Sequence, residues 1–158
     1  MSLNTCTVSH AAGWDLPVKL GDPKSEVYAT LGGPSHKPTD DVEWFQNSGL
    51  VIKYDPAGRV SQVIVHGEFN SKFITYREPV IYGLKVTDTL DKLYAVLGQP
   101  VSIEDGSHLA QQTKTYKWRK APYFIEAEVW SKDVTEWDRL FKAGTIEMLT
   151  IGKAVGGQ

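Results

Sequence analysis

The sequence predicts an α+β fold built from two tandem units, each a short helix followed by an antiparallel β-meander. The first observation behind this is a repeat: YATLGGPS, which begins at Tyr28, returns as YAVLGQPV from Tyr94. The second is that each copy ends a segment with helical spacing of apolar residues. The third is that three strand-like runs follow each copy, separated by Gly- and Pro-containing turns. A motif that recurs together with its flanking pattern indicates a duplicated structural unit.

The two copies predict two helices that begin and end alike. Asp22, which precedes a proline, is expected to cap the first helix, and Thr87 or Asp88 the second. Gly32 and Gly98 are each followed by proline two residues later. Glycine tolerates a positive φ and proline cannot continue a helix, so these residues predict the two helix ends.

Strands are expected from alternating apolar and polar residues. In the first unit they cover 42–45, 50–54 and 60–67, and in the second unit 115–119, 123–130 and 145–152.

One segment breaks the internal symmetry and predicts an inserted helix over 132–143. Asp133 and Glu136 have the spacing of a capping box, and Gly144 follows as a stop. A helical apolar stripe lies between them, made of Val134, Trp137, Leu140 and Phe141. The predicted organisation is a single compact domain with a first unit at 15–67, an aromatic linker at 68–82 and a second unit at 83–153.

The doubled pattern of helix entry, Y-A-x-L-G-x-P and a Trp-bearing or aromatic strand resembles the repeat of the β-lactamase inhibitor protein family. It also looks like the single-unit domain of small outer-membrane assembly lipoproteins. The resemblance covers about residues 15–66 and 82–152. It implies two units side by side whose sheets form one continuous concave surface with helices behind, and a protein that binds proteins and catalyses nothing.

Composition and motifs exclude several classes of function. The formal net charge is -2, with Lys and Arg scattered, which disfavours nucleic acid as a partner. The four histidines include no helical metal pair, and no nucleophile or phosphate-loop motif is present. We therefore expect no enzyme activity, no cofactor and no metal. Glu126 and Glu128 share a strand face and could do acid–base work, but a solvent-facing sheet surface is the favoured interpretation.

Strand alternation divides the side chains between two faces. In the strand at 123–130, one face is apolar throughout and should pack against the helices. The other face mixes two aromatic side chains with two carboxylates, a composition typical of protein interfaces. The predicted partner-binding residues are Glu43, Phe45, Val51, Lys53, Lys117, Arg119, Phe124, Glu126, Glu128 and Trp130, with Trp137 on the inserted helix added. The alternative is that the linker or the inserted helix covers these aromatics as ordinary core.

The favoured function is a protein-binding inhibitor, namely a cytoplasmic bacterial immunity protein that occludes the active site of a cognate toxin or effector enzyme. One alternative is an envelope-assembly lipoprotein-like module, periplasmic and anchored to the membrane through Cys6, which requires a signal segment removed from the chain. Without lipidation of Cys6 we expect no membrane partner. Another alternative is a small-molecule binder or enzyme that uses the cleft between the units, with His66 and the glutamates.

Overall fold

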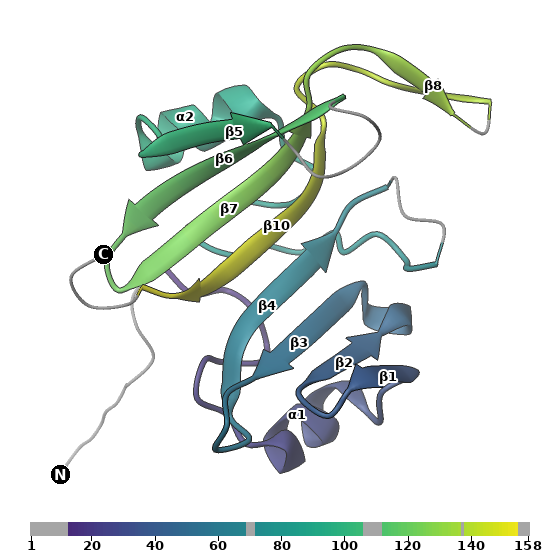
Figure 1. The fold of residues 1–158 in the computed structure, drawn as a ribbon, viewed down its shortest axis with the longest axis vertical. Helices are drawn as coiled ribbons and strands as arrows, with labels where there is room; N and C mark the ends of the chain where they lie inside the picture. The colour runs from purple at the N-terminus through teal and green to yellow at the C-terminus, as the bar shows by residue number, and fades with distance from the viewer. Residues whose placement is uncertain (1–12, 69–71, 106–111, 137, 155–158) are drawn as a thin grey trace, which may run out of the picture.

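The structure, a computed structural model, describes residues 13–68, 72–105, 112–136 and 138–154 (Figure 1). Eight strands form one antiparallel sheet in the order β1-β2-β3-β4-β10-β7-β6-β5, and two further strands form a hairpin. The strands of the sheet are β1 (His36–Thr39), β2 (Val42–Phe45), β3 (Leu50–Tyr54), β4 (Val60–His66), β5 (Ser102–Asp105), β6 (Thr113–Lys120), β7 (Tyr123–Trp130) and β10 (Ile146–Lys153). The hairpin strands are β8 (Val134–Glu136) and β9 (Arg139–Phe141).

The predicted fold class was wrong. The described chain is mostly β, with two short helices and a 3-10 turn (Gln46–Ser48), and it does not divide into two helix-plus-sheet units. The strands assigned to two units are not separate, because β4 and β10 pair directly at the centre of the sheet. They pair at five positions, from Met148↔His66 to Gly152↔Gln62. This ladder joins the strands into one sheet that shares one main core. The chain boundaries at 67 and 83 stay a prediction.

The two helices lie where the repeated motif places them. They are α1 (Lys24–Leu31) and α2 (Leu90–Leu97), and both lie behind the sheet as drawn in Figure 1. Gly32 and Gly98 end them with φ of 82° and 81°, and each donates its backbone N–H to a tyrosine carbonyl one turn earlier. A side chain with a Cβ is strained at such a φ, which explains glycine at both ends.

The aspartates expected to cap these helices do something else. Asp22 Oδ2 accepts the backbone N–H of Lys19 at 2.9 Å, and Asp88 Oδ2 accepts that of Lys85 at 2.8 Å. Each aspartate therefore closes a turn just before its helix. Neither helix has a side-chain hydrogen bond at its N-cap, which is Pro23 for α1 and Thr89 for α2.

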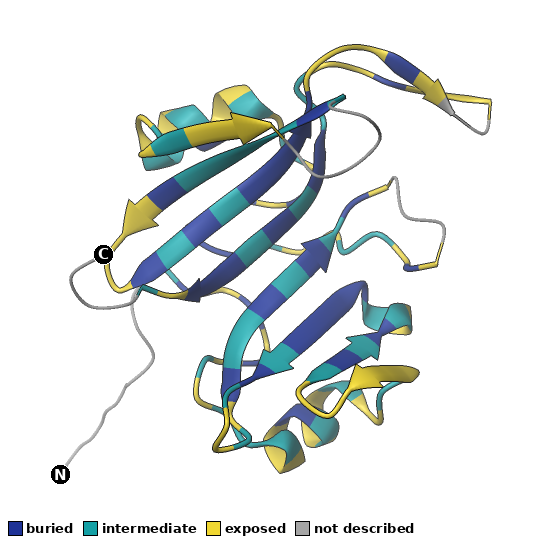
Figure 2. Ribbon diagram, in the orientation of Figure 1, coloured by how far each residue is buried: buried dark blue, intermediate teal, exposed yellow. Residues whose placement is uncertain are grey.

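The core lies between the helix side of the sheet and the helices. Val27 of α1 and Leu93 of α2 are fully buried in one cluster with Leu50, Ile125 and Leu149 of the strands. The segments 14–18 and 80–86 add buried side chains to the same cluster. Figure 2 shows the buried residues concentrated on the inner strands of the sheet and the exposed ones on β1, on β5 and on the hairpin.

The helix expected over 132–143 is instead the β8–β9 hairpin, in which Val134 pairs with Phe141. Both of these side chains are buried against Trp130 at the end of β7. Leu140, which the helical stripe would also bury, is 55% exposed. Packing against Trp130 therefore favours the two-residue period of a strand over the helical one.

Candidate functional site

One row of side chains crosses all eight strands on the side of the sheet that faces away from the helices. Directly paired residues share a face, and the row runs His36–Trp44–Val51–Ile64–Thr150–Glu126–Lys117–Ser102. We call this side the open face. Its other members are Val42 of β2, Lys53 of β3, Gln62 and His66 of β4, Met148 and Gly152 of β10, Phe124, Glu128 and Trp130 of β7, Thr113, Thr115 and Arg119 of β6, and Glu104 of β5.

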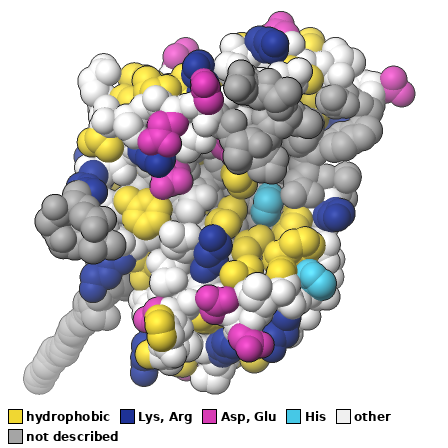
Figure 3. All heavy atoms as spheres, in the orientation of Figure 1, with side chains coloured by type: hydrophobic (Ala, Val, Ile, Leu, Met, Phe, Trp, Pro, Cys, Tyr) yellow, Lys and Arg dark blue, Asp and Glu magenta, His cyan; other side chains and the backbone are white. Residues whose placement is uncertain are grey.

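The open face has an apolar half and a charged half. Across β2, β3 and β4 the row presents Trp44, Val51 and Ile64, and across β7 and β6 it presents Glu126 and Lys117. Of these only Val51 is buried, at 5% exposure, and the others are half-buried. The space-filling view shows hydrophobic side chains interspersed with groups of both charges on this side of the molecule (Figure 3).

The linker covers one end of the apolar half. Phe73, 8% exposed, stacks on His66 with ring centroids 4.1 Å apart and lies 5.4 Å from the Trp44 ring. His36 meets the same Trp44 ring edge-on at 4.7 Å. His66 pairs with Met148 in the β4–β10 ladder at the middle of the sheet, and the alternative of a small-molecule binder or enzyme that uses His66 stays a prediction.

The hairpin covers the end of β7. The rings of Trp130 and Phe141 stack at 5.9 Å, and Trp130 is 1% exposed. Arg139 of β9 pairs with Glu68 at 2.6 Å and lies over the Phe141 ring, which ties the hairpin to the start of the linker. Trp130 thus lies on the face that the sequence predicts, but the hairpin packs over it.

The two glutamates predicted on β7 differ in burial. Glu128 is 5% exposed and accepts the Thr113 hydroxyl at 2.7 Å, whereas Glu126 is half-buried at the edge of a surface hollow. The hollow has a volume of about 320 Å³ and lies at one end of β6 and β7. Its lining consists of Val101, Lys117, Trp118, Arg119, Phe124, Glu126 and Ala154.

The open-face assignment of Glu43 and Phe45 was wrong. Their strand partners are Ile52 and Leu50, which belong to the core, and both residues lie on the helix side. Phe45 is 3% exposed and its ring is 6.5 Å from that of Tyr28 on α1. The VEWF strand has an aromatic residue on each face, so its alternation alone fits either orientation.

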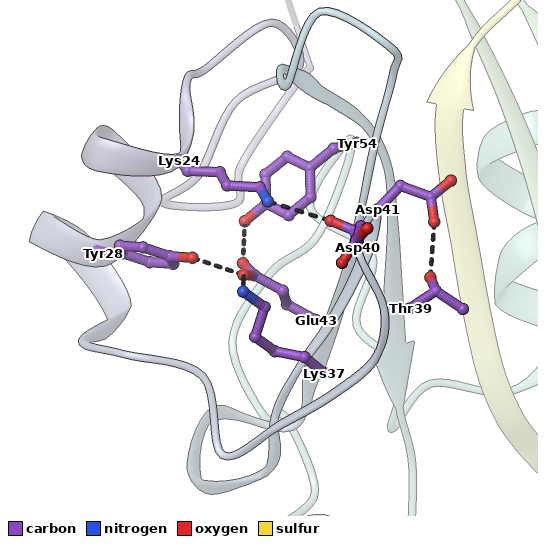
Figure 4. A network of polar contacts seen from close by, with 8 residues as sticks. All are labelled: Lys24, Tyr28, Lys37, Thr39, Asp40, Asp41, Glu43 and Tyr54. Carbon is purple, nitrogen blue, oxygen red and sulfur yellow. Dashed lines mark hydrogen bonds and ion pairs between the residues drawn. The ribbon is translucent and has the colours of Figure 1, made fainter.

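Glu43 is fully buried and holds together a small polar network (Figure 4). Its carboxylate accepts the Tyr28 hydroxyl at 2.5 Å and the Tyr54 hydroxyl at 2.7 Å, and Lys37 lies 3.6 Å away. Lys24 donates to the Asp40 carbonyl and lies 4.9 Å over the Tyr54 ring. This cluster was not predicted from the sequence. The feature that could have predicted it is a glutamate between apolar neighbours, with tyrosines on the preceding helix and on the next strand.

The network makes the free energy of unfolding fall at alkaline pH. Burial first, and then the bond to Glu43, raise the pKa of Tyr28 from 10.0 to about 12, and the same two causes raise the pKa of Tyr54. The folded state therefore holds these protons at a pH where the unfolded chain loses them. Their stabilisation is complete below about pH 10; the contribution of Tyr28 is lost as pH rises from 10 through about 12, and that of Tyr54 also falls above pH 10. Denaturant titrations at pH 9.5 and 11.5 should show this fall, and Tyr28→Phe/Tyr54→Phe should make it smaller. An equal fall in the double variant would contradict the network.

The remaining sequence-predicted groups are placed as follows. Val51 and Lys53 lie on the open face as expected, on β3. Trp137, Cys6, His10 and His108 lie outside the described residues. Within the described ranges, no three His, Cys, Asp or Glu side chains gather closely enough to hold a metal ion. In the same ranges, neither helix has the length and apolar character that crossing a membrane requires.

The comparisons with known proteins bear on the fold alone. No protein-family model matches the sequence, and no curated protein matches it either. Among solved structures, the chain is similar to a DUF4309 family protein, YjgB, from Bacillus subtilis subsp. subtilis str. 168. The TM-score is 0.54 at 13% identity, over 84% of this chain and 78% of that one. The resemblance to the inhibitor repeat and to the lipoprotein domain stays a prediction.

Proposed function

We propose that this protein binds another protein through the open face of its sheet and inhibits it, as an immunity protein neutralises a toxin. The observation that carries the proposal is the row from Trp44 to Lys117, in which the half-buried side chains of Trp44 and Ile64 share a face with Glu126 and Lys117. Protein interfaces combine an apolar centre with charged groups that orient the partner. Both helices pack on the other side of the sheet, and Ile64 and Thr150 in the middle of this row are half-buried.

The structure changes which side chains would contact the partner. Trp130 is packed under the hairpin, and Glu43 and Phe45 are buried on the helix side. The contact surface of the proposal is therefore centred on Ile64, Met148 and Thr150, which are half-buried in the middle strands. The proposed mechanism is steric. When the partner docks across the middle of the sheet, its contacting surface is covered and substrate cannot reach it.

Crosslinking in cells of the source organism tests the proposal. A photoreactive amino acid is placed at Ile64 or at Met148 on the open face, and for comparison at Ala29 or at Ala95, which are exposed on the helices. We expect one protein to be captured from both open-face positions and from neither helix position. The purified partner must then lose its own activity when the protein is added in stoichiometric amount. Equal capture from the helices, or a saturated complex with unchanged activity, would contradict the proposal.

A further inference from the structure

The hollow on the charged half of the open face has the form of a binding site. Phe124 does not stand away from the sheet, because its ring lies over Gly152 on the neighbouring strand β10. A Cβ at position 152 would overlap this ring, so glycine at that position permits the ring to lie flat. Phe124 lines the hollow together with Arg119 of β6 and Val101, which precedes β5.

Three charged side chains line the hollow: Lys117, Arg119 and Glu126. Lys117 is paired with Glu104 at 3.1 Å. Arg119 is exposed and Glu126 is half-buried. Beyond the backbone ladder, neither side chain has a hydrogen bond or ion pair with a described residue. Arg119 lies directly across from Phe124 and Lys117 directly across from Glu126 in the β6–β7 ladder. The site therefore offers a guanidinium that binds carboxylates in pairs of hydrogen bonds, a carboxylate acceptor, and the aromatic ring of Phe124 beside them.

We propose that this hollow binds the C-terminal residue of a partner protein, with an apolar last side chain. Its carboxylate bonds to Arg119, its own amide N–H donates to Glu126, and its side chain packs on Phe124 and Val101. A chain end carries a carboxylate, an amide N–H and an apolar side chain on one residue, whereas a glutamate residue has a carboxylate and an amide N–H but no apolar side chain to pack on Phe124. A doubly charged phosphate would also meet the Glu126 carboxylate. The inference rests on the proposed function, because it takes the ligand to be part of a protein.

The test is a titration of the ¹⁵N-labelled full chain with short peptides, followed by nuclear magnetic resonance. The probe is acetyl-Gly-Gly-Leu with a free carboxylate. The comparison peptides are the same sequence ending in an amide, and acetyl-Gly-Glu-Gly-amide, which has only a side-chain carboxylate. Inorganic phosphate is a fourth arm. We expect the free acid to shift amide signals within 117–126, with a dissociation constant on the order of 1 mM, and the other three probes to bind at least fivefold more weakly.

Two variants distinguish specific binding in the hollow from a non-specific attraction of the peptide by positive charge. Arg119→Gln should weaken binding of the free-acid peptide at least fivefold. Arg77→Gln, on the exposed linker, should leave the affinity for this peptide unchanged. Equal binding of the amide peptide, or no effect of Arg119→Gln, would overturn the site. Equal binding of the Glu peptide or of phosphate would overturn the assignment to a chain end. Peptide binding without any crosslinked partner would contradict the proposed function alone, and the reverse result would contradict this site alone.

Discussion

Replacing Glu43 with alanine should lower the free energy of unfolding by about 3 kcal/mol. The carboxylate is fully buried and is the acceptor for two tyrosine hydroxyls, so its loss leaves Tyr28 and Tyr54 without their partner. Glu43→Gln should cost only about 1 kcal/mol, because a glutamine amide offers an acceptor and a donor to hydroxyls that can do both. Urea denaturation of the three proteins at neutral pH measures the difference.

The control for this series is Glu26→Ala. Glu26 is exposed in the first turn of α1, and its removal should change stability by less than about 0.5 kcal/mol. The comparison also decides the orientation of β2. If Glu43→Ala costs no more than Glu26→Ala, Glu43 is a surface residue, as the sequence predicts, and the network of Figure 4 is wrong.

Trp130→Ala should cost about 3–4 kcal/mol and release the hairpin from the sheet. Trp130 is 1% exposed, and with Val134 and Phe141 it forms a small core separate from the main one. Removal of the indole takes away the contact that Val134 and Phe141 make with Trp130. Hydrogen exchange should then show faster exchange of the β8 and β9 amides, while β3 and β4 keep their protection.

Leu140→Ala, on β9 of the hairpin, is the control, because Leu140 is 55% exposed next to the buried Phe141. It should change stability by less than about 0.5 kcal/mol. If Trp130→Ala is as stable as the wild type, Trp130 is an exposed contact residue, as the sequence predicts, and the hairpin does not pack over it.

Local signals in the sequence predicted the ends of elements well. The glycine and proline after each helix predicted where α1 and α2 end, because these residues act through backbone geometry that no distant contact alters. The capping aspartates were misplaced for a related reason. Asp22 and Asp88 can satisfy either a helix N-terminus or a preceding turn, and both bond back to the lysine three residues earlier.

Predictions that depend on tertiary contacts were less reliable. The apolar face of β7 was assigned correctly because Ile125, Ala127 and Val129 leave one interpretation. On β2 each face carries an aromatic, and the contacts with Tyr28 and Tyr54 decide the orientation. At 132–143 a helical stripe and a hairpin both bury Val134 and Phe141, and only the position of Trp130 selects the hairpin. The hollow could not be predicted, because its lining brings together Val101, Phe124 and Ala154 from separate parts of the chain.

The central claim, that the open face is the contact surface, is tested most directly by the affinity of the crosslinked partner for two matched variants. Thr150→Arg places a long side chain in the middle of the open face, and Thr30→Arg places the same side chain on the exposed surface of α1. Isothermal titration calorimetry should show at least a hundredfold loss of affinity for Thr150→Arg and wild-type affinity for Thr30→Arg. Wild-type affinity for Thr150→Arg, in a protein that unfolds like the wild type, would contradict the account.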